Sequence, residues 1–432
     1  MKYAAYLATA LVAATAAFAQ APATVDRQAA TEKDYRATLS RVGIQQIRPG
    51  AVDAAGQAPP ERTGTPLPPL LIDAAGRPVD SRGAWERRRR ELTAQLDSEI
   101  YGSVPATAPG IRWQLVHQEY RRIGGVPAVT RRFVGRAASF GLDSPYFAIE
   151  LSIDMPEAGR GRLPVILEIG DAEAAAGPGG AGREAVLRRG WGFAVLIAPT
   201  VQPDDGAGLR QGVIGFSAQG RARGNGDWGT LRAWAWGASR AYDLFLLDPR
   251  IDRRRVAVEG SARYGKTALL ALATDERFSL GFAGSSGPGG AAPLRREIGE
   301  RIGNLAAANT YHWFAPNFLR YAGPRQPSEL PVDAHSLIAL VAPRALFIGA
   351  GSFSEDGWTD PRGAWDAARA ASPVWRLYGQ EGLAGEAYPA INEARDSGRI
   401  AFRQHDGGRS NDRNWPAFLS FAARIWELDP AR

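Results

Sequence analysis

The 432-residue sequence contains no cysteine and only four histidines. Without cysteine there can be no disulfide bonds, no thiolate nucleophile and no thiolate metal ligand, so a hydrophobic core must stabilise the fold. The histidines show neither the H-x-H nor the H-x-x-x-H spacing of metal ligands, and the glycine-rich stretches 177–182 and 287–290 lack the Gly-Lys-Ser/Thr ending of a phosphate-binding loop. We therefore expect no metal ion and no cofactor.

Lysine is almost absent as well: after Lys2 the chain has only Lys33 and Lys266. Arginine supplies nearly all of the positive charge, and the formal net charge is +7. The arginines are spread through every segment, and the one dense run, 87–90, lies in a helical pattern that indicates a solvated face. A nucleic-acid partner is therefore not expected. Either the basic charge suits an anionic polysaccharide, or it reflects the arginine bias of the genome.

Long apolar runs are missing beyond the start of the chain. Met1-Lys2 is followed by the apolar stretch 3–18 and by Ala17-Phe18-Ala19, a small-x-small site that could be cut before Gln20. This pattern predicts a secretory signal peptide over residues 1–19. A membrane anchor is the alternative, but the run is alanine-rich and short for a span. We expect a periplasmic or secreted monomer with no membrane association after cleavage.

Residues 20–79 are rich in alanine, proline and glycine, which predicts an extended N-terminal arm with little regular structure that lies across the main domain. Residues 80–432 form that domain. It begins with a helix that Ser81 caps and that ends at Tyr101-Gly102. The domain is long enough to bury a large core.

Two kinds of strand follow the first helix. Segments with period two indicate antiparallel edge strands, and they cover 111–121, 129–135 and 145–153. Solid apolar runs separated by helical segments then indicate strands buried on both faces, at 163–169, 192–198, 280–284, 344–350 and 400–404. The sequence thus predicts an α/β fold: a three-layer sandwich with a mostly parallel central sheet and antiparallel N-terminal edge strands.

The stretch Val256 to Leu272 reads as a strand, a tight turn over 260–265 and a helix from about Lys266. This is the geometry of the nucleophile elbow in the α/β-hydrolase fold, in which G-x-S-x-G places a serine on a strained turn. Here the middle position is Ala262, and a methyl group cannot attack a carbonyl. The sequence therefore predicts an α/β-hydrolase fold without the usual nucleophile.

Candidate site residues follow the apolar runs, because the chemistry of such folds gathers at the carboxyl ends of the strands. Triad members in this fold occur in the chain order nucleophile, acid, histidine. The positions in that order are Ala262, then Glu355 or Asp356, then Arg409.

The chain resembles the glucuronoyl esterases, exported α/β-hydrolases that cleave esters between lignin alcohols and glucuronic acid on xylan. Their elbow reads G-x-S-R-x-G-K, which Gly260, Arg263, Gly265 and Lys266 match. Further motifs occur in the same order over most of the chain: R-R-x-E-L and Y-G-x-x-P within 85–105, G-D-W-G at 226–229, S-G-x-G-G at 286–290, Y-H-W-F at 311–314, L-P-V-D-x-H at 330–335 and A-P-R at 342–344.

The resemblance implies that Ala262 replaces the family nucleophile and that Arg409 replaces the catalytic histidine. It places the acid either in the loop around 285–288, which has no carboxylate here, or at Glu355 and Asp356. Asp356 is the better candidate. Either carboxylate could instead be a solvent-facing loop residue.

The sugar-binding part of the family site is matched more fully. The resemblance implies that Arg263 contacts the oxyanion, that Lys266 contacts sugar hydroxyls and that Trp358 packs against the uronate ring. Arg263 could instead pin the turn through carbonyl groups. His405, four residues before Arg409, is a further candidate at the substrate and a possible replacement base, although such histidines are commonly structural.

Two classes of function remain, a working carbohydrate esterase and a binding protein built on a disabled one. Loss of both nucleophile and base favours the second, because triad members act as a unit. We predict a glucuronoyl esterase-like protein that binds a uronic-acid-containing carbohydrate, such as glucuronoxylan or a lignin-carbohydrate ester, with little or no hydrolysis. With Arg263 and Lys266, Arg409 would place three cations near the uronate carboxyl group.

Two alternatives stay open. A displaced pair, Ser261 and His405, could sustain hydrolysis. The chain could also be an engineered inactive variant of an active esterase, although Arg409 is not the usual second change for that purpose.

Overall fold

A computed structural model describes residues 26–51, 66–138, 147–159, 161–176 and 180–428. The predicted signal peptide, the start of the predicted strand 145–153 and the glycine-rich stretch at 177–179 lie outside these residues. None of the helices described is long and apolar enough to cross a membrane.

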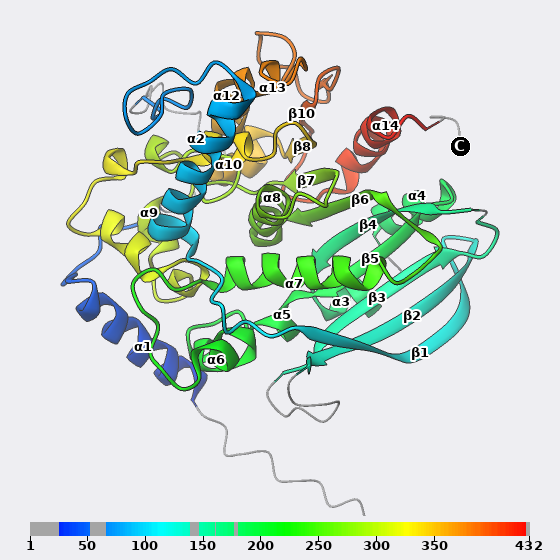
Figure 1. The fold of residues 1–432 in the computed structure, drawn as a ribbon, viewed down its shortest axis with the longest axis horizontal. Coiled ribbons are helices and arrows are strands. Elements are labelled where there is room, and N and C mark those ends of the chain that lie inside the picture. Colours follow the sequence, from blue (N-terminus) through cyan, green and yellow to red (C-terminus); the bar gives the residue numbers. More distant parts are fainter. Residues whose placement is uncertain (1–25, 52–65, 139–146, 160, 177–179, 429–432) are drawn as a thin grey trace, which may run out of the picture.

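The described strands form one ten-stranded sheet in the order β1-β2-β3-β5-β4-β6-β7-β8-β10-β9 (Figure 1). From β5 to β10 the neighbours are parallel, and the pairs β1/β2, β2/β3, β3/β5 and β9/β10 are antiparallel. The strands are β1 (Ile111–Ile123), β2 (Val126–Ala137), β3 (Ile149–Pro156), β4 (Leu163–Gly170), β5 (Gly192–Ile197), β6 (Ile251–Ser261), β7 (Leu280–Gly284), β8 (Ala345–Ala350), β9 (Ala394–Arg395) and β10 (Ile400–Gln404). The predicted parallel sheet with antiparallel N-terminal edge strands is confirmed.

Helices cover both faces of the sheet, as the predicted three layers require (Figure 1). Helices α7 and α8 pack on one face and α4 and α14 on the other. The helices are α1 (Arg27–Arg41), α2 (Arg82–Leu96), α3 (Ala172–Ala176), α4 (Ala181–Arg188), α5 (Ala198–Val201), α6 (Gly212–Ala218), α7 (Thr230–Phe245), α8 (Arg263–Thr274), α9 (Ile302–Leu305), α10 (Ala334–Ala339), α11 (Phe353–Asp356), α12 (Pro361–Ala371), α13 (Pro373–Arg376) and α14 (Trp415–Ile425).

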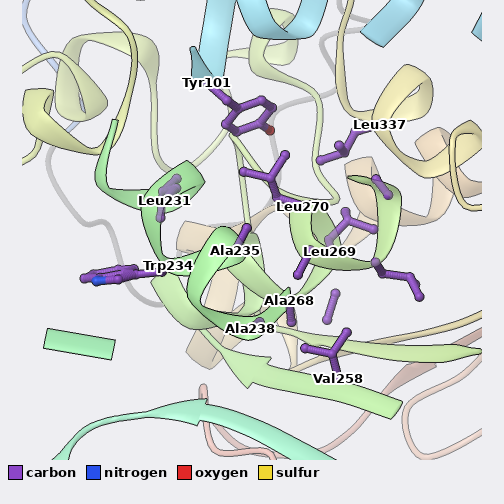
Figure 2. Packing of buried hydrophobic residues seen from close by; sticks show 14 of the residues in the cluster. Tyr101, Leu231, Trp234, Ala235, Ala238, Val258, Ala268, Leu269, Leu270 and Leu337 are labelled. Carbon is purple, nitrogen blue, oxygen red and sulfur yellow. The ribbon is translucent and has the colours of Figure 1, made fainter. Parts of the chain in front are cut away.

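The core on the α7 and α8 side fixes the position of the elbow helix. Figure 2 shows Ala268 and Leu269 of α8 close to Val258 of β6, with Ala238 of α7 beside them. All four side chains are at most 1% exposed. Small residues on both helices let their backbones approach closely, and full burial of each leucine contributes about 1.5 to 3 kcal/mol.

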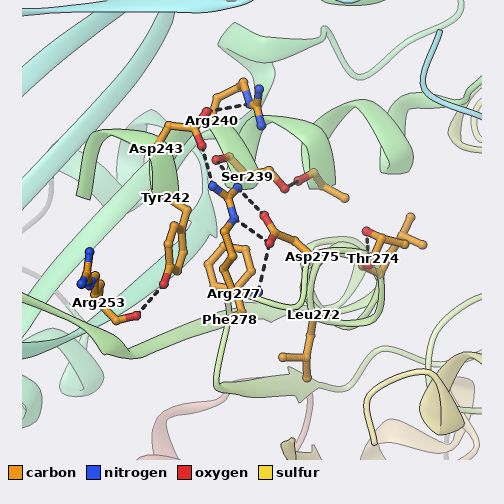
Figure 3. Close-up of polar contacts among 12 residues, drawn as sticks. Ser239, Arg240, Tyr242, Asp243, Arg253, Leu272, Thr274, Asp275, Arg277 and Phe278 are labelled. Carbon is orange, nitrogen blue, oxygen red and sulfur yellow. Dashed lines mark hydrogen bonds and ion pairs between the residues drawn. The ribbon is translucent and has the colours of Figure 1, made fainter. Parts of the chain in front are cut away.

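A polar cluster holds the far end of α8 to α7 (Figure 3). The guanidinium of Arg277 donates to Asp275 at 2.6 and 2.8 Å and to Asp243 at 2.7 Å, and it lies 4.7 Å from the ring centre of Tyr242. These hydrogen bonds raise the pKa of Arg277 and lower that of Asp275, although burial opposes both shifts. The elbow helix is thus held by the core at its middle and by this cluster at its C-terminal end.

The N-terminal arm differs from the prediction, because it contains the 15-residue helix α1 (Figure 1). The side chain of Asp26 caps this helix by accepting from the N–H groups of Gln28 and Ala29. The high alanine content of this segment, which we interpreted as a sign of irregular structure, also favours a helix once it is capped. Residues 27–51 of the arm lie on the main domain, where Arg27 donates to Asp205 at 2.8 Å and Arg48 donates to the carbonyl of Gly323 at 2.7 Å.

Candidate functional site

Ala262 occupies the sharp turn between β6 and α8, where the sequence predicts an elbow. Its backbone has φ 52° and ψ −121°, a conformation that costs a residue with a side chain about 1 to 3 kcal/mol. Its N–H donates to the carbonyl of Gly284 at 2.9 Å, and its carbonyl accepts from the N–H of Lys266 at 3.1 Å. These two hydrogen bonds hold the strained turn at the carboxyl end of the sheet.

Two glycines make this turn possible. A Cβ atom on Gly260 would lie 2.4 Å from the carbonyl oxygen of Tyr264, and one on Gly265 would lie 2.5 Å from that of Gly284. Real Cβ atoms do not approach backbone that closely, so both positions accept only glycine. The geometry required for a nucleophile is therefore intact, although position 262 carries a methyl group.

Asp356 and Arg409 meet beside the elbow, from the loops after β8 and β10. Arg409 Nε donates to Asp356 Oδ1 at 3.1 Å. Asp356 is fully buried, and its Oδ2 accepts from the hydroxyl of Ser285 at 2.7 Å and from the N–H of Gly351 at 3.1 Å. The side chain of Arg409 is 43% exposed. Glu355, the other acid candidate, is exposed, so only Asp356 is held against the arginine.

Arg263, the first residue of α8, lies against Asp204, a residue that the sequence analysis missed. Arg263 Nε is 2.9 Å from Asp204 Oδ2. The other oxygen, Oδ1, accepts from Trp313 Nε1 at 2.6 Å and lies 3.0 Å from His312 Nε2. The alternative in which Arg263 pins the turn through carbonyl groups receives no support from these contacts.

Lys266 is buried, and its three N–H donors match three acceptors. Its Nζ donates to Glu300 at 2.6 Å and to the carbonyls of Pro288 and Ser286 at 2.7 and 2.8 Å. The N–H of Glu300 in turn donates to the carbonyl of Trp358 at 2.8 Å. Lys266 and the half-buried Trp358 thus share Glu300, and a sugar hydroxyl could reach Lys266 only by displacing one of the three acceptors.

Ser261 and His405, the displaced pair, are not brought together. The hydroxyl of Ser261 donates to the carbonyl of Arg409 at 3.1 Å. His405 is 1% exposed, with Nε2 2.9 Å from the carbonyl of Gly408 and Nδ1 2.9 Å from Nδ2 of Asn414. Since Asn414 donates to Nδ1, Nε2 carries the proton, and burial lowers the pKa of this histidine. This geometry counts against both roles considered for His405, base and ligand contact.

A second feature missed by the sequence analysis is a pair of carboxyl groups beside the elbow. Glu168 of β4 is the register partner of Glu259 of β6, and with Ser261 they line a cavity of about 260 Å³. Burial raises the pKa of Glu168 to about 7, and burial together with the charge of Glu168 raises that of Glu259 well above its usual value. The signal available in the sequence was a glutamate near the end of each of two apolar strand segments, Glu168 in β4 and Glu259 in β6.

Comparisons with known proteins place the chain among carbohydrate esterases. A family described as glucuronyl esterase of fungi matches residues 222–379. A carbohydrate esterase from an unknown prokaryotic organism is 32% identical over 395 residues, which is 82% of this chain and 88% of that protein. The 4-O-methyl-glucuronoyl methylesterase 1 of Phanerochaete chrysosporium is 28% identical over 325 residues, 72% of this chain and 62% of that protein.

Solved structures show the same likeness. A CE15 glucuronoyl esterase from Teredinibacter turnerae is 36% identical and superposes with a TM-score of 0.84, covering 92% of this chain and all of that chain. A glucuronoyl esterase from Solibacter usitatus is 31% identical with a TM-score of 0.76, covering 85% of this chain and 99% of that chain.

Proposed function

Because this chain belongs to the glucuronoyl esterase family, we propose that it binds the uronic-acid part of a plant cell-wall carbohydrate but does not hydrolyse esters by the serine mechanism. The ligand class is glucuronoxylan or a lignin-carbohydrate ester. The protein is exported to the periplasm or the medium, where such polysaccharide is met.

The contact between Arg409 and Asp356 carries this proposal. In a serine esterase a histidine lies on the buried acid, takes the proton of the serine and later returns it to the leaving group. Here the group on the buried Asp356 is a guanidinium, which has N–H donors and no atom that accepts a proton. Ala262 has no proton to give. Both halves of the proton transfer are therefore lost, while the acid and the elbow backbone remain.

Retention of ligand binding rests on the other residues of the site. Arg263 is 40% exposed on the first turn of α8, and Trp358 is half-buried on the segment Gly357–Thr359. Lys266, on the first turn of α8, would contribute by exchanging one of its three acceptors for a sugar hydroxyl. These are the residues that the family resemblance associates with the oxyanion, the uronate ring and the sugar hydroxyls.

The net positive charge of the site is smaller than the three cations Arg263, Lys266 and Arg409 alone would give. Each has a carboxylate partner within 3.1 Å, in the pairs Arg409–Asp356, Arg263–Asp204 and Lys266–Glu300. The three pairs together are close to neutral. Recognition of a uronate must therefore rest on placed N–H donors rather than on a general positive field.

One pair of measurements on the purified protein tests the proposal. Calorimetry with glucuronic acid and its methyl ester should show binding of both, and incubation with the methyl or benzyl ester should release no alcohol beyond the uncatalysed rate. Steady turnover would contradict the loss of catalysis. Absence of binding to either ligand would contradict a retained uronate site.

A further inference from the structure

Asp204 lies between Arg263 of the elbow helix and two residues of the segment Tyr311–Trp313. It lies in the segment before the short helix Ala207–Arg210, and its side chain is 24% exposed. One oxygen faces Arg263 Nε at 2.9 Å, and the other faces Trp313 Nε1 and His312 Nε2 at 2.6 and 3.0 Å. Both carboxylate oxygens are thus engaged.

The carboxyl group of Asp204 is held in its charged form by its neighbours. Burial raises the pKa of its carboxyl group, but the hydrogen bonds from His312 and Trp313 and the charges of His312 and Arg263 outweigh burial and hold the pKa below its usual value. The carboxylate is therefore ionised throughout the neutral range and keeps a full negative charge on the Nε edge of Arg263.

The contact with Asp204 involves the Nε atom of Arg263 and leaves the edge of the guanidinium that carries Nη1 and Nη2 for a ligand. Arg263 Nη2 lies 3.4 Å from the hydroxyl of Tyr264, and the guanidinium carbon is 4.8 Å from the centre of that ring. In the part of the chain that the structure describes, Nη1 makes no hydrogen bond. Among the described residues the contact with Asp204 is an ion pair without a hydrogen bond from Nε, and together with the ring of Tyr264 it restricts the orientation of the guanidinium and of its remaining N–H groups.

Helix α1 fixes Asp204 from outside. Arg27 donates to both oxygens of the next residue, Asp205, at 2.8 Å, and Thr31 accepts from the N–H of Ala207 at 3.0 Å. On the other side of Asp204, the hydroxyl of Tyr311 donates to Asp34 at 2.7 Å. The helix thus holds both segments that meet at Asp204.

His312 and Trp313 already anchor the loop that carries Asp204. The contact with Arg263 adds nothing that this anchoring requires, but it reaches the half-exposed arginine directly after Ala262. We propose that Asp204 is a positioning residue, which orients the guanidinium of Arg263 toward the ligand and makes the Asp204 loop and α1 part of the ligand site. The identity of the ligand as a uronate rests on the function proposed above.

The experiment compares Asp204→Asn with the matched control Asp80→Asn, which removes one exposed negative charge that the site and helix α1 do not use. Calorimetry uses methyl glucuronate, because an uncharged ligand does not respond to the change in net charge. We expect about a tenfold loss of affinity in Asp204→Asn, less than a twofold change in the control and melting temperatures within a few degrees of the parent for both.

A double variant separates positioning from a general structural effect. Arg263→Met should weaken binding, and Asp204→Asn combined with Arg263→Met should be no weaker than Arg263→Met alone, because Asp204 acts only through the arginine. Losses that multiply in the double variant would overturn the proposal, and so would full affinity in Asp204→Asn. If that variant fails to fold, Asp204→Glu displaces the same carboxylate with its charge kept and should show a smaller loss of the same kind.

A second readout needs no ligand. Labelling of arginines by phenylglyoxal, mapped to peptides by mass spectrometry, should be several-fold faster at Arg263 in Asp204→Asn than in the parent or the control. If the parent binds no glucuronate, the proposed function fails, yet the labelling rate still shows whether Asp204 restrains Arg263. An unchanged rate would overturn the positioning role whatever the ligand.

Discussion

Arg409 Nε lies 3.1 Å from the buried Oδ1 of Asp356, so a guanidinium binds the carboxylate that would otherwise orient a catalytic histidine. The other oxygen of Asp356 is satisfied by Ser285 and Gly351. The acid is therefore fixed independently of the residue at 409. The serine mechanism therefore lacks its side chains at positions 262 and 409 only, and the residues around these two positions keep the arrangement that the mechanism needs.

Restoring the two residues should restore the reaction. We expect Ala262→Ser combined with Arg409→His to hydrolyse methyl or benzyl glucuronate at least a thousandfold faster than the parent, since the elbow strain, the acid and Arg263 are already in place. Release of methanol or benzyl alcohol measures the rate. Ala262→Ser alone should gain far less, because Arg409 cannot accept the proton of the serine. Activity as high in this single variant as in the double one would contradict the role assigned to position 409.

Arg409 should distinguish the free acid from its ester. Its half-exposed guanidinium can donate to a uronate carboxylate, but Asp356 already neutralises part of its charge, so we expect the acid to bind only about tenfold better than the methyl ester. Arg409→Met should weaken the acid and leave the ester nearly unchanged in calorimetry. Equal losses for both ligands would instead assign Arg409 to holding its loop.

Lys266 should be required for stability. Its removal leaves the carboxylate of Glu300 and two backbone carbonyls without their donor in a buried place, and such a change costs about 3 to 5 kcal/mol. Urea denaturation of Lys266→Met should show this loss. Lys33→Met is the matched control, because Lys33 is exposed on α1, and it should stay within about 0.5 kcal/mol of the parent.

Glu168 should make the protein less stable as the pH rises. Its folded pKa of about 7 lies above the value of about 4.3 in an unfolded chain, so the folded state holds its proton more tightly. The contribution is complete below about pH 4 and is lost as the pH rises through 7. The melting temperature should therefore fall between pH 5 and 8, and Glu168→Gln should flatten that fall and raise the melting temperature at pH 8. An equal slope in both proteins would contradict the shift.

The sequence predicts the sheet well because period two and solid apolar runs are local signals of strands exposed on one face or buried on both. It also places Ala262 on its turn, since the glycines at 260 and 265 are required by contacts along the same stretch of chain. Helix α1 was missed because the residues on which it docks are distant in the sequence. Asp204 could not be found for the same reason: its link to Arg263 exists only once the loops of the sheet meet. The division of the chain at residues 19 and 79 remains a prediction.

For Lys266 and Asp356 the sequence gives the residue type but not the groups that each side chain contacts. The resemblance to esterases suggested an open cation and left two candidate acids, because residue types do not reveal their partners. Only the geometry shows that Lys266 is surrounded by acceptors and that Asp356, not its exposed neighbour Glu355, meets Arg409.

The docking of α1 bears on the order in which the molecule assembles. Arg27 finds Asp205 at a separation of 178 residues, and Asp34 finds Tyr311 at a separation of 277. A 15-residue helix is marginally stable alone in water, and contacts of such long range form late in folding. Helix α1 therefore cannot complete its docking before the chain has been made as far as Tyr311. We expect the sheet and elbow to form before α1 docks, so that Asp204 and Arg263 are brought into register as one of the last events of folding.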